Sequence, residues 1–569
     1  MVNDFIERWA RLRDQREDQV FLVLTILIGA LAGLAVVAFI VLTERLGMRL
    51  YPVGSAAWRR VLVPIGGSLA MGYLLYRYFP NARGSGVPQT KAALFARGGF
   101  ISLRTVLGKF GCTAATLASG IPLGREGPSV QVGAGIASVL GRALGLRPEK
   151  VKALLPVGAS AAIAAAFNTP MAAVVFSLEE VMGDLNAPVL GSVVMASATS
   201  WMVLRLVLGN NPLFHVPQYE LVHPLEFAVY AVLGVAGGFL SVAFTKLLLE
   251  MRKRFLLLPR KTWWWHPVVG GIIVGLMGWF VPQALGVGYV YVGAALNNTM
   301  AFKLMALLVA LKLFAVTTSY ASGNAGGIFG PSLFLGAMLG GTIGSVAHHY
   351  LPGYTASPGA YALVGMGALF AGIVRAPMTS VLMIFEMTRD YSVIVPLMIA
   401  NLASLFISSR FQKQPIYEAL AHQDGIHLPN IKERSGSGRR TVALIMRNVT
   451  EFLPAEMSVQ QAVESVRASK FRSWPVMDQG NVVGVLARSS LESANDNGRS
   501  EQAVLSLLET LEFPHVHADH ALHLSLERMS QARIDILPVV HRADVHKLEG
   551  IVTLRDVLDS YGVDSQGPA

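Results

Sequence analysis

Three glycine- and proline-containing segments interrupt the apolar stretches of this chain, and their composition suits the binding of a small anion. They read Gly-Ser-Gly-Val-Pro at 84–88, Gly-Arg-Glu-Gly-Pro at 124–128 and Gly-Gly-Ile-Phe-Gly-Pro at 326–331. Unwound segments that lead into helices present free backbone N–H groups and the positive end of the helix dipole. Such partial charges attract chloride and still let it leave, whereas a full buried cation would hold it too tightly. We therefore expect three helix N-termini to form an anion site.

The second segment also carries a carboxylate, Glu126, among apolar residues. An ionised carboxylate is costly there unless it pairs, takes up a proton or accepts hydrogen bonds from the backbone. It can also occupy the position of a chloride. Deprotonated Glu126 would then block the path and protonated Glu126 would swing away, so one group would be both a gate and a proton carrier. The alternative is a static salt bridge with Arg125, although adjacent residues point in different directions on most backbones.

The elements that must position these segments are membrane helices. The 569-residue chain is 53% hydrophobic and 15% charged, with a mean hydropathy of +0.49, which excludes an ordinary soluble protein. Apolar runs at 20–46, 61–79, 227–249 and 301–316 reach or approach the ~20 residues that span a bilayer as a helix. A closed β-barrel, the alternative, would not produce runs this long.

The breaks in these helices predict two inverted repeats. Irregular backbone at membrane depth is tolerated only inside protein or a cavity, and paired broken helices usually mark a transport site. Gly127-Pro128 and Gly330-Pro331 form such a pair, 203 positions apart, which is near half of a membrane region ending around residue 418.

Charge and cysteine content exclude two further classes of function. The net charge is +11, but the basic residues gather at membrane edges, at 59–60 and 252–261, and three tryptophans follow at 263–265. The positive-inside rule and an aromatic belt explain this pattern better than a nucleic-acid surface. Cys112 is the single cysteine, so neither a disulfide framework nor a CxxC metal or redox site exists.

Taken in order, the three segments resemble the CLC family of chloride channels and proton-coupled chloride transporters. Arg-Ala-Pro at 375–377, Glu-Met-Thr at 386–388 and a late Gln-Pro-Ile-Tyr at 414–417 extend the match over about 20–420.

The resemblance implies that the Ser85 hydroxyl and the Tyr417 phenol hold the central anion from two sides, with backbone amides from Ile328 and Phe329. Considered alone, Ser85 could instead be a helix N-cap, and Tyr417 an anchor at the membrane edge.

Two acids at 179–180 bear on proton coupling. In proton-coupled family members an acid matching Glu180 passes protons to the inner side, whereas channels commonly have an apolar residue there. The resemblance therefore implies H+/Cl− antiport, with proton transfer through Glu126 and Glu180. The alternative is a voltage- or pH-gated chloride channel without proton coupling. We expect Glu179 to act in a polar network, and the simplest alternative for both acids is a solvated cytoplasmic helix end.

Four other polar residues match polar positions of the family: Lys109, Lys312, Arg375 and Glu386. We expect them to neutralise one another or to line the entrances. A membrane-embedded enzyme is disfavoured, because no metal cluster, nucleophile with its base or cofactor fingerprint accompanies the carboxylates. The chain is thus expected not to be an enzyme, to require no metal or cofactor, and to take chloride as its substrate.

The region after the polar stretch at 411–440 reads as a soluble α/β domain. Trp-Pro-Val-Met at 474–477 and Leu-Pro-Val-Val at 537–540 begin two similar units, which resemble a tandem pair of CBS domains. Such pairs often bind adenine nucleotides. The second unit keeps Thr553 and Asp556 in the spacing that usually contacts a ribose, whereas the first has Ala487 and Ser490. A nucleotide sensor and a structural module that stabilises a dimer both stay open.

The predicted fold class is an all-α polytopic membrane domain of CLC type, with two inverted repeats and broken helices, followed by a small α/β CBS-pair domain. The predicted divisions are a cytoplasmic N-terminal segment at 1–19, a transmembrane domain at 20–420, a linker at 421–440, tandem CBS domains at 441–563 and a tail at 564–569. Segment 1–19 reads as a retained leader and not as a cleavable signal. We expect a homodimer without nucleic acid, in a bacterial inner (plasma) membrane, with the CBS domains in the cytoplasm.

Overall fold

The computed structural model separates into two compact units, Met1–Gln423 and Asp424–Ala569. The structure describes residues 17–52, 54, 56–185, 188–209, 213–214, 216–217, 219, 221–426, 428, 441–508 and 513–561. Residues 1–16, most of the predicted linker at 421–440 and the predicted tail at 564–569 lie outside the described residues.

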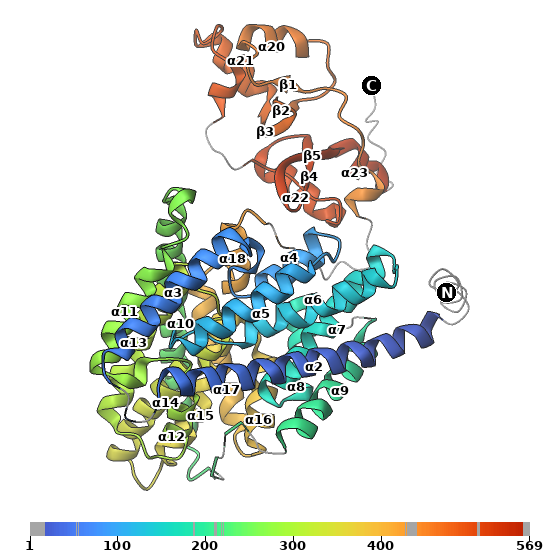
Figure 1. The fold of residues 1–569 in the computed structure, drawn as a ribbon. Helices are drawn as coiled ribbons and strands as arrows, with labels where there is room; N and C mark the ends of the chain where they lie inside the picture. The colour runs from blue at the N-terminus through green and yellow to red at the C-terminus, as the bar shows by residue number, and fades with distance from the viewer. Residues whose placement is uncertain are drawn as a thin grey trace, which may run out of the picture. The chain divides into compact units, whose positions relative to one another are not determined.

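The first unit is helical, and seven of its described helices are long and apolar enough to cross a bilayer (Figure 1). The first half contains α2 (Glu17–Leu50), α3 (Arg59–Arg77), α4 (Val87–Ala96), α5 (Leu103–Ala118), α6 (Glu126–Ala143), α7 (Pro148–Phe167), α8 (Pro170–Phe176), the π-helical turn η2 (Ser177–Met182) and α9 (Leu190–Leu208). The second half contains α10 (Glu226–Leu257), α11 (Pro267–Phe280), α12 (Tyr289–Leu296), α13 (Phe302–Ala321), α14 (Phe329–Tyr350), α15 (Pro358–Val374), α16 (Pro377–Thr388), α17 (Ile394–Phe411) and α18 (Ile416–Gln423). The four predicted apolar runs fall in α2, α3, α10 and α13.

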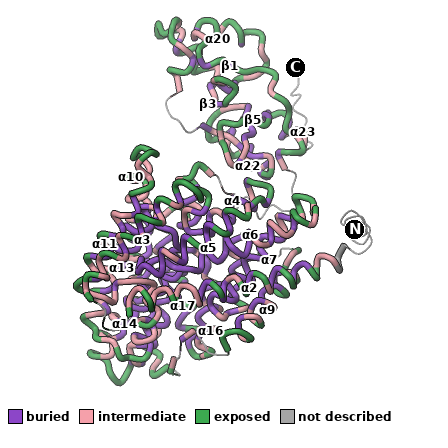
Figure 2. Tube along the Cα trace, in the orientation of Figure 1, coloured by how far each residue is buried: buried purple, intermediate pink, exposed green. Residues whose placement is uncertain are grey.

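Buried residues fill the interior of this unit (Figure 2), and α7 and α14 are among its most enclosed helices. In α7 and α14, 83% and 72% of the most apolar stretch is buried, against 28% in α9. A helix that is apolar all round is stable only inside protein or lipid. The inner helices are therefore enclosed by protein, whereas most of the apolar stretch of α9 is exposed on the surface of this unit.

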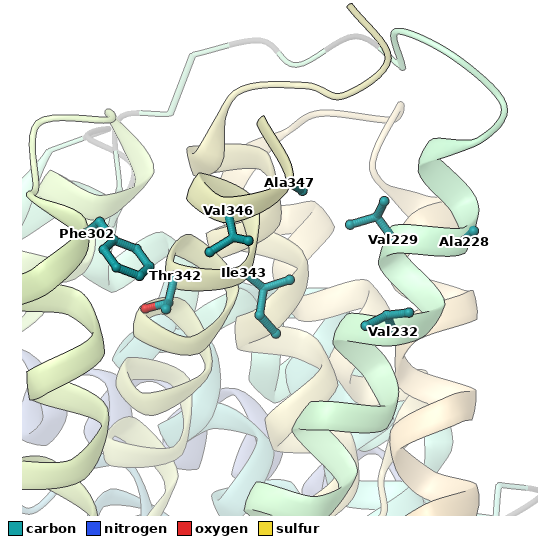
Figure 3. Close-up of a pocket in the computed structure, with 8 residues that line it drawn as sticks. All are labelled: Ala228, Val229, Val232, Phe302, Thr342, Ile343, Val346 and Ala347. Atoms are coloured by element: carbon teal, nitrogen blue, oxygen red, sulfur yellow. The ribbon is translucent and has the colours of Figure 1, made fainter. Parts of the chain in front are cut away.

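One apolar groove opens between α10, α13 and α14 (Figure 3). It measures about 410 Å³, and its lining includes Val229, Val232, Phe302, Ile343 and Val346. Since this lining offers almost no polar surface, the groove is not part of an ion site.

The two halves repeat the same succession of breaks and turns. α5 ends before the segment that opens α6, and α13 ends before the segment that opens α14. Gly124 and Gly327, 203 positions apart, join the two segments in an antiparallel bridge whose two N–H···O distances are both 2.7 Å. α7 ends at Asn168 and α15 at Arg375, both in the left-handed conformation, with φ of 60° and 66°.

Equivalent glycines also bring the inner helices together in each half. A Cβ on Gly133 of α6 would lie 2.2 Å from the carbonyl oxygen of Gly158 on α7. A Cβ on Gly336 of α14 would lie 2.3 Å from the carbonyl oxygen of Gly365 on α15. Small residues of this kind let membrane helices approach closely, because no side chain separates their backbones. The predicted two-repeat architecture is therefore visible in both chain breaks and packing.

The second unit contains two α/β subunits with the same strand pairing. In the first, β1 (Leu453–Pro454) pairs in parallel with β2 (Ser473–Asp478), which pairs antiparallel with β3 (Asn481–Ala487). In the second, β4 (Ile536–His541) pairs antiparallel with β5 (Asp544–Thr553), and a parallel bridge joins Val516 to Val539. The helices are α20 (Val459–Val466) and α21 (Arg488–Asp496), then α22 (Leu522–Ala532) and α23 (Leu554–Ser560).

Candidate functional site

Ser85 Oγ and Tyr417 Oη are among the buried hydroxyls of the membrane unit that lack a hydrogen-bond partner. Both side chains are fully buried. They lie close enough to interact electrostatically, yet the contact does not meet the geometry of a hydrogen bond. Leaving a polar group unsatisfied in a protein interior is costly. The pair therefore marks a place where a ligand can accept two O–H donors.

The local backbone explains why Ser85 is available. The N-cap of α4 is Gly86, with φ of 107°, and its N–H donates to the side chain of Gln89 at 2.7 Å. Ser85 N donates to Tyr320 Oη at 3.1 Å, and Ser85 Oγ does not cap the helix and has no hydrogen-bond partner. The N-cap alternative for Ser85 is therefore not what the structure contains. Tyr417 likewise lies inside the protein and not at an exposed membrane edge.

The N-termini of α4 and α6 meet beside this pair. A Cβ on Gly86 would lie 2.1 Å from the Gly127 carbonyl oxygen, and one on Gly127 would lie 2.5 Å from the Ser85 carbonyl oxygen. Only glycine permits so close an approach of two backbones. The sequence thus places two helix dipoles at one point.

The N-terminus of α14 completes the arrangement. Ile328 is its N-cap residue and Phe329 its first residue, and both are fully buried. The first N–H groups of a helix have no partner within the helix. The bridge between Gly124 and Gly327 holds this turn against the segment that opens α6.

The Glu126 carboxylate accepts hydrogen bonds from the opposite half of the unit. Tyr289 Oη donates to Glu126 Oε1, and Gly330 N donates to Oε2 at 3.2 Å. A Cβ on Gly124 would lie 2.4 Å from Oε2 and 3.0 Å from Gly330 N, so any larger residue there would crowd the carboxylate. Arg125 instead lies 3.8 Å from Glu44 and 5.6 Å from the Tyr289 ring. The static pair between Arg125 and Glu126 is therefore not formed.

Glu180 is held by a lysine that the sequence pattern did not single out. Lys91 Nζ lies 2.7 Å from Glu180 Oε1, and the two side chains are 2% and 7% exposed. Glu180 is thus a buried, ion-paired carboxylate and not a solvated helix end. The Tyr417 phenol lies within electrostatic range of both Glu180 and Glu126. All four predicted side chains, Ser85, Glu126, Glu180 and Tyr417, consequently gather in one region.

Glu179 and Glu386 form a reciprocal pair of helix caps. Glu179, after α8, accepts from Thr379 N at 2.8 Å and Met378 N at 3.3 Å in the first turn of α16. Glu386, on α16, accepts from Ala172 N at 2.7 Å and Met171 N at 3.0 Å in the first turn of α8. A carboxylate at a helix N-terminus satisfies free N–H groups and the dipole. These two acids are therefore structural.

The expectation that four polar residues neutralise one another is wrong. Among the described residues, Lys109 donates to the Ala82 carbonyl at 3.1 Å and also to that of Gly84, and Lys312 donates to the Gly286 and Val287 carbonyls. Arg375 donates to carbonyls in the last turn of α17 and just after it, and Glu386 caps α8. Unwound chain and helix ends leave backbone groups without partners, and these side chains satisfy them.

Sequence reasoning missed two functional neighbours, Tyr289 and Lys91. Tyr289 resembled a packing aromatic, and only its hydroxyl contact with Glu126 distinguishes it. Lys91 offered a usable signal, since a lysine in a short, mostly apolar helix between membrane spans requires a buried counter-charge.

In the second unit, the two predicted ribose contacts serve a helix cap. Thr553 Oγ1 lies 2.7 Å from Asp556 Oδ2 and accepts from Asp556 N at 3.2 Å, and Arg447 pairs with Asp556. Both side chains are therefore engaged within the domain. Among the described residues, no group of three or more His, Cys, Asp or Glu side chains is arranged to hold a metal.

The fold and site define a polytopic membrane protein with broken helices that converge on a small anion-binding site, followed by a paired α/β module. Residues 66–409 match the family described as voltage gated chloride channel, and residues 442–494 and 509–562 match the CBS domain. The chain belongs to the voltage gated chloride channel, or CLC, family and carries a CBS pair.

The match to this chain extends over most of the length of two individual relatives. A putative chloride channel protein ClcB-like of Ralstonia nicotianae is 34% identical over 65% of this chain and 88% of its own length. An H(+)/Cl(−) exchange transporter ClcA of Vibrio cholerae is 30% identical over 71% of this chain and 89% of its own.

Solved structures support the same fold. That of a slow cyanobacterial Cl−/H+ antiporter has a TM-score of 0.65 and 27% identity, covering 71% of this chain and 97% of the antiporter chain. A eukaryotic CLC transporter, at 20% identity and a TM-score of 0.62, covers 94% of this chain and 97% of its own. At that identity the likeness concerns the fold alone.

Proposed function

We propose that the protein exchanges chloride for protons across a membrane. The observation that carries this proposal is a pair of buried, unsatisfied hydroxyls, on Ser85 and Tyr417, beside a carboxylate that rests on backbone and phenol donors. Relatives named as H(+)/Cl(−) exchange transporters support it. Chloride is the substrate, and the activity is transport, not an enzymatic reaction.

Each candidate residue has a distinct part in this function. Ser85 and Tyr417 donate their hydroxyls to chloride, and the amides of Ile328 and Phe329 supply partial positive charge. Glu126 takes the place of the anion when deprotonated and releases that place when protonated. The carboxylate then carries its proton outward, so gating and proton movement use one group.

Glu180 is the second proton-transfer residue in this proposal. Its burial and its position within electrostatic range of Tyr417 support this role. A carboxylate at this depth relays protons because it can exist in both charge states when a partner compensates.

A flux assay in liposomes tests the proposal. Purified protein is reconstituted, an outward chloride gradient is imposed, and proton entry and chloride exit are recorded together. We expect uphill proton movement in the wild type, abolished in Glu180→Gln with chloride flux retained. Glu179→Gln, the adjacent carboxylate in a capping role, is the matched control and should keep coupling. Chloride flux without any proton movement in the wild type would instead establish the gated channel.

We propose that the CBS pair lies in the cytoplasm, and the ends of α10 and α18 support this side of the membrane. Gln423, at the end of α18, accepts from Arg252 Nη1 at 3.0 Å and donates to the Leu249 carbonyl at 2.9 Å. The basic end of α10 is cytoplasmic by the positive-inside rule. A chain that leaves the membrane unit there continues in the cytoplasm, and we assign the membrane to the bacterial inner membrane.

Apolar surfaces on α9 and α17 support a homodimer. Leu206 is 83% exposed and Phe406 is 71% exposed. We assign these surfaces to contact with a second copy, with one pathway in each protomer, and cross-linking in native membranes tests this assembly.

The CBS pair remains a candidate adenine-nucleotide site at Thr553 and Asp556. Binding there requires that the Asp556 cap opens, and binding of ATP to purified protein tests it. The boundaries 20–420 and 441–563 are likewise proposals.

A further inference from the structure

Lys91 connects the anion region to Glu180 through a single short helix. It lies on α4, whose N-terminal segment carries Ser85, and it is five residues beyond the Gly86 N-cap. At 1.5 Å per residue this is roughly 7–8 Å along the helix axis. Its ammonium lies 2.7 Å from the Glu180 carboxylate, and both side chains are almost completely buried.

The ion pair makes protonation of Glu180 dependent on other charges nearby. While Glu180 is ionised, Lys91 and Glu180 together are neutral. When Glu180 takes up a proton, the Lys91 ammonium is left buried without its counter-charge, which is strongly unfavourable. An anion held beside Ser85 restores the balance, because the region is again neutral overall.

We propose that Lys91 is a positioning residue that makes proton uptake by Glu180 and anion binding beside Ser85 favour each other. Lys91 acts through Glu180 and does not contact the anion. The coupling is reciprocal: if protonation of Glu180 raises chloride affinity by some factor, chloride raises the proton affinity of Glu180 by the same factor. This inference rests on the proposed exchange function and names the charge that links its two ions.

Few other titratable groups face this carboxylate among the described residues. Tyr417 on α18 lies within electrostatic range of it, and Tyr417 is also within range of Tyr320 and Glu126. α7 carries its titratable side chains at 149–152, in its first two turns, and α8 carries none. Glu179 and Asp184 share the chain segment of Glu180, and Glu179 is engaged in the α16 cap.

Chloride binding at two pH values tests this linkage. Glu126→Gln serves as the background, because it removes the titration of the gate itself. We expect purified Glu126→Gln protein to bind chloride about tenfold more tightly at pH 5 than at pH 8 by calorimetry, within the usual range of coupling. Adding Lys91→Met should make the affinity independent of pH, since a buried Glu180 without the Lys91 ammonium beside it stays protonated. Adding Lys91→Arg, which keeps the charge, should retain the dependence.

A second variant tests the same linkage if Lys91→Met does not fold. Glu180→Gln in the same background must also abolish the pH dependence, and an unchanged dependence in either variant overturns the proposal. Measuring proton and chloride flux together in liposomes provides a separate test. If the wild type moves no protons, the exchange function fails. If it does, and Lys91→Met keeps the wild-type proton-to-chloride ratio, only the role of Lys91 fails.

Discussion

The two broken segments at the centre of the membrane unit share a backbone but differ in the side chains that it presents. Gly124 and Gly327 are paired, and the residues that follow are Arg125-Glu126 in one half and Ile328-Phe329 in the other. One half therefore offers a carboxylate, and the other offers an aromatic ring at the equivalent position. The same backbone arrangement can thus supply a movable carboxylate from one half of the membrane unit and fixed backbone donors from the other half.

The surroundings explain why the carboxylate belongs to the first half only. The Phe329 ring lies 4.9 Å from that of Phe167 and 4.4 Å from that of Phe370, measured between centroids. A carboxylate placed there would lose its solvation without gaining donors. Glu126, in contrast, accepts from Gly330 N and Tyr289 Oη, which both come from the second half.

Of the substitutions that test this difference between the halves, neutralising the Glu126 gate should change transport the most. In Glu126→Gln we expect proton movement to disappear, because no titratable group remains at the gate, while chloride continues to flow. Parallel proton and chloride flux in liposomes measures both. Phe329→Leu, at the equivalent position of the other half, should retain coupling. A Glu126→Gln protein that still drives protons uphill would show that the two halves do not divide the work in this way.

Removing one donor to Glu126 should shift the competition between carboxylate and chloride. Tyr289→Phe deletes the hydroxyl but keeps the ring beside Arg125. Since a hydrogen bond to a charged group contributes about 1.5–3 kcal/mol, chloride should bind roughly 10- to 100-fold more tightly at neutral pH. Calorimetric titration checks this value. Tyr291→Phe, on the same helix, is the matched control, and equal affinities in the two variants would exclude a role for Tyr289.

The CBS subunits offer a second comparison, because residues 441–508 contain no histidine whereas the second subunit contains six. Burial lowers the pKa of His517 to about 2, with Arg542 adding to the effect, and burial also lowers the pKa of His515. Nδ1 of His517 lies 2.7 Å from the Val540 carbonyl oxygen and donates to it.

Acid should therefore destabilise the second subunit selectively. The folded state binds fewer protons than the unfolded state, whose histidines titrate near pH 6.5, so stability falls as the pH drops below that value. The loss approaches about 1.4 kcal/mol per pH unit for each such histidine, or about 2 kcal/mol at pH 5 for His517. Hydrogen exchange of full-length protein, corrected for intrinsic rates, should show faster opening of 513–541 and no change in 453–487. His517→Gln should reduce the response, and an equal response in both subunits would refute this explanation.

Removing either of the two reciprocal helix caps should have the smallest effect, and the two effects should be nearly equal. Glu386→Gln and Glu179→Gln each remove the charge that faces a helix N-terminus, at a cost of about 0.5–1 kcal/mol. The apparent melting temperature in detergent should fall by about 1–2 °C in either variant. Glu179→Gln should cost slightly more, because its carboxylate also accepts from Thr379 Oγ1 at 2.6 Å. A large difference between the two would mean that the halves are not equivalent here.

Much of the fold was accessible from the chain itself. Long apolar runs require helices in a membrane, and Gly-Pro pairs end or begin those helices whatever their tertiary surroundings. A carboxylate among apolar residues marked Glu126 as a candidate site residue, and the family resemblance that the three ordered segments carry implied Ser85. The CBS pair followed from repeated strand patterns, since alternation and turns are local properties.

Partners that come from distant parts of the chain could not be read in the same way. Tyr289 lies 163 positions from Glu126, Lys91 lies 89 positions from Glu180, and Glu386 lies 214 positions from Ala172. Composition and spacing determined that this chain crosses a membrane as interrupted helices with a carboxylate at one interruption. Only the packing of the two halves decided which donors that carboxylate meets and which lysine balances Glu180, because buried charges are set by neighbours in space and not in sequence.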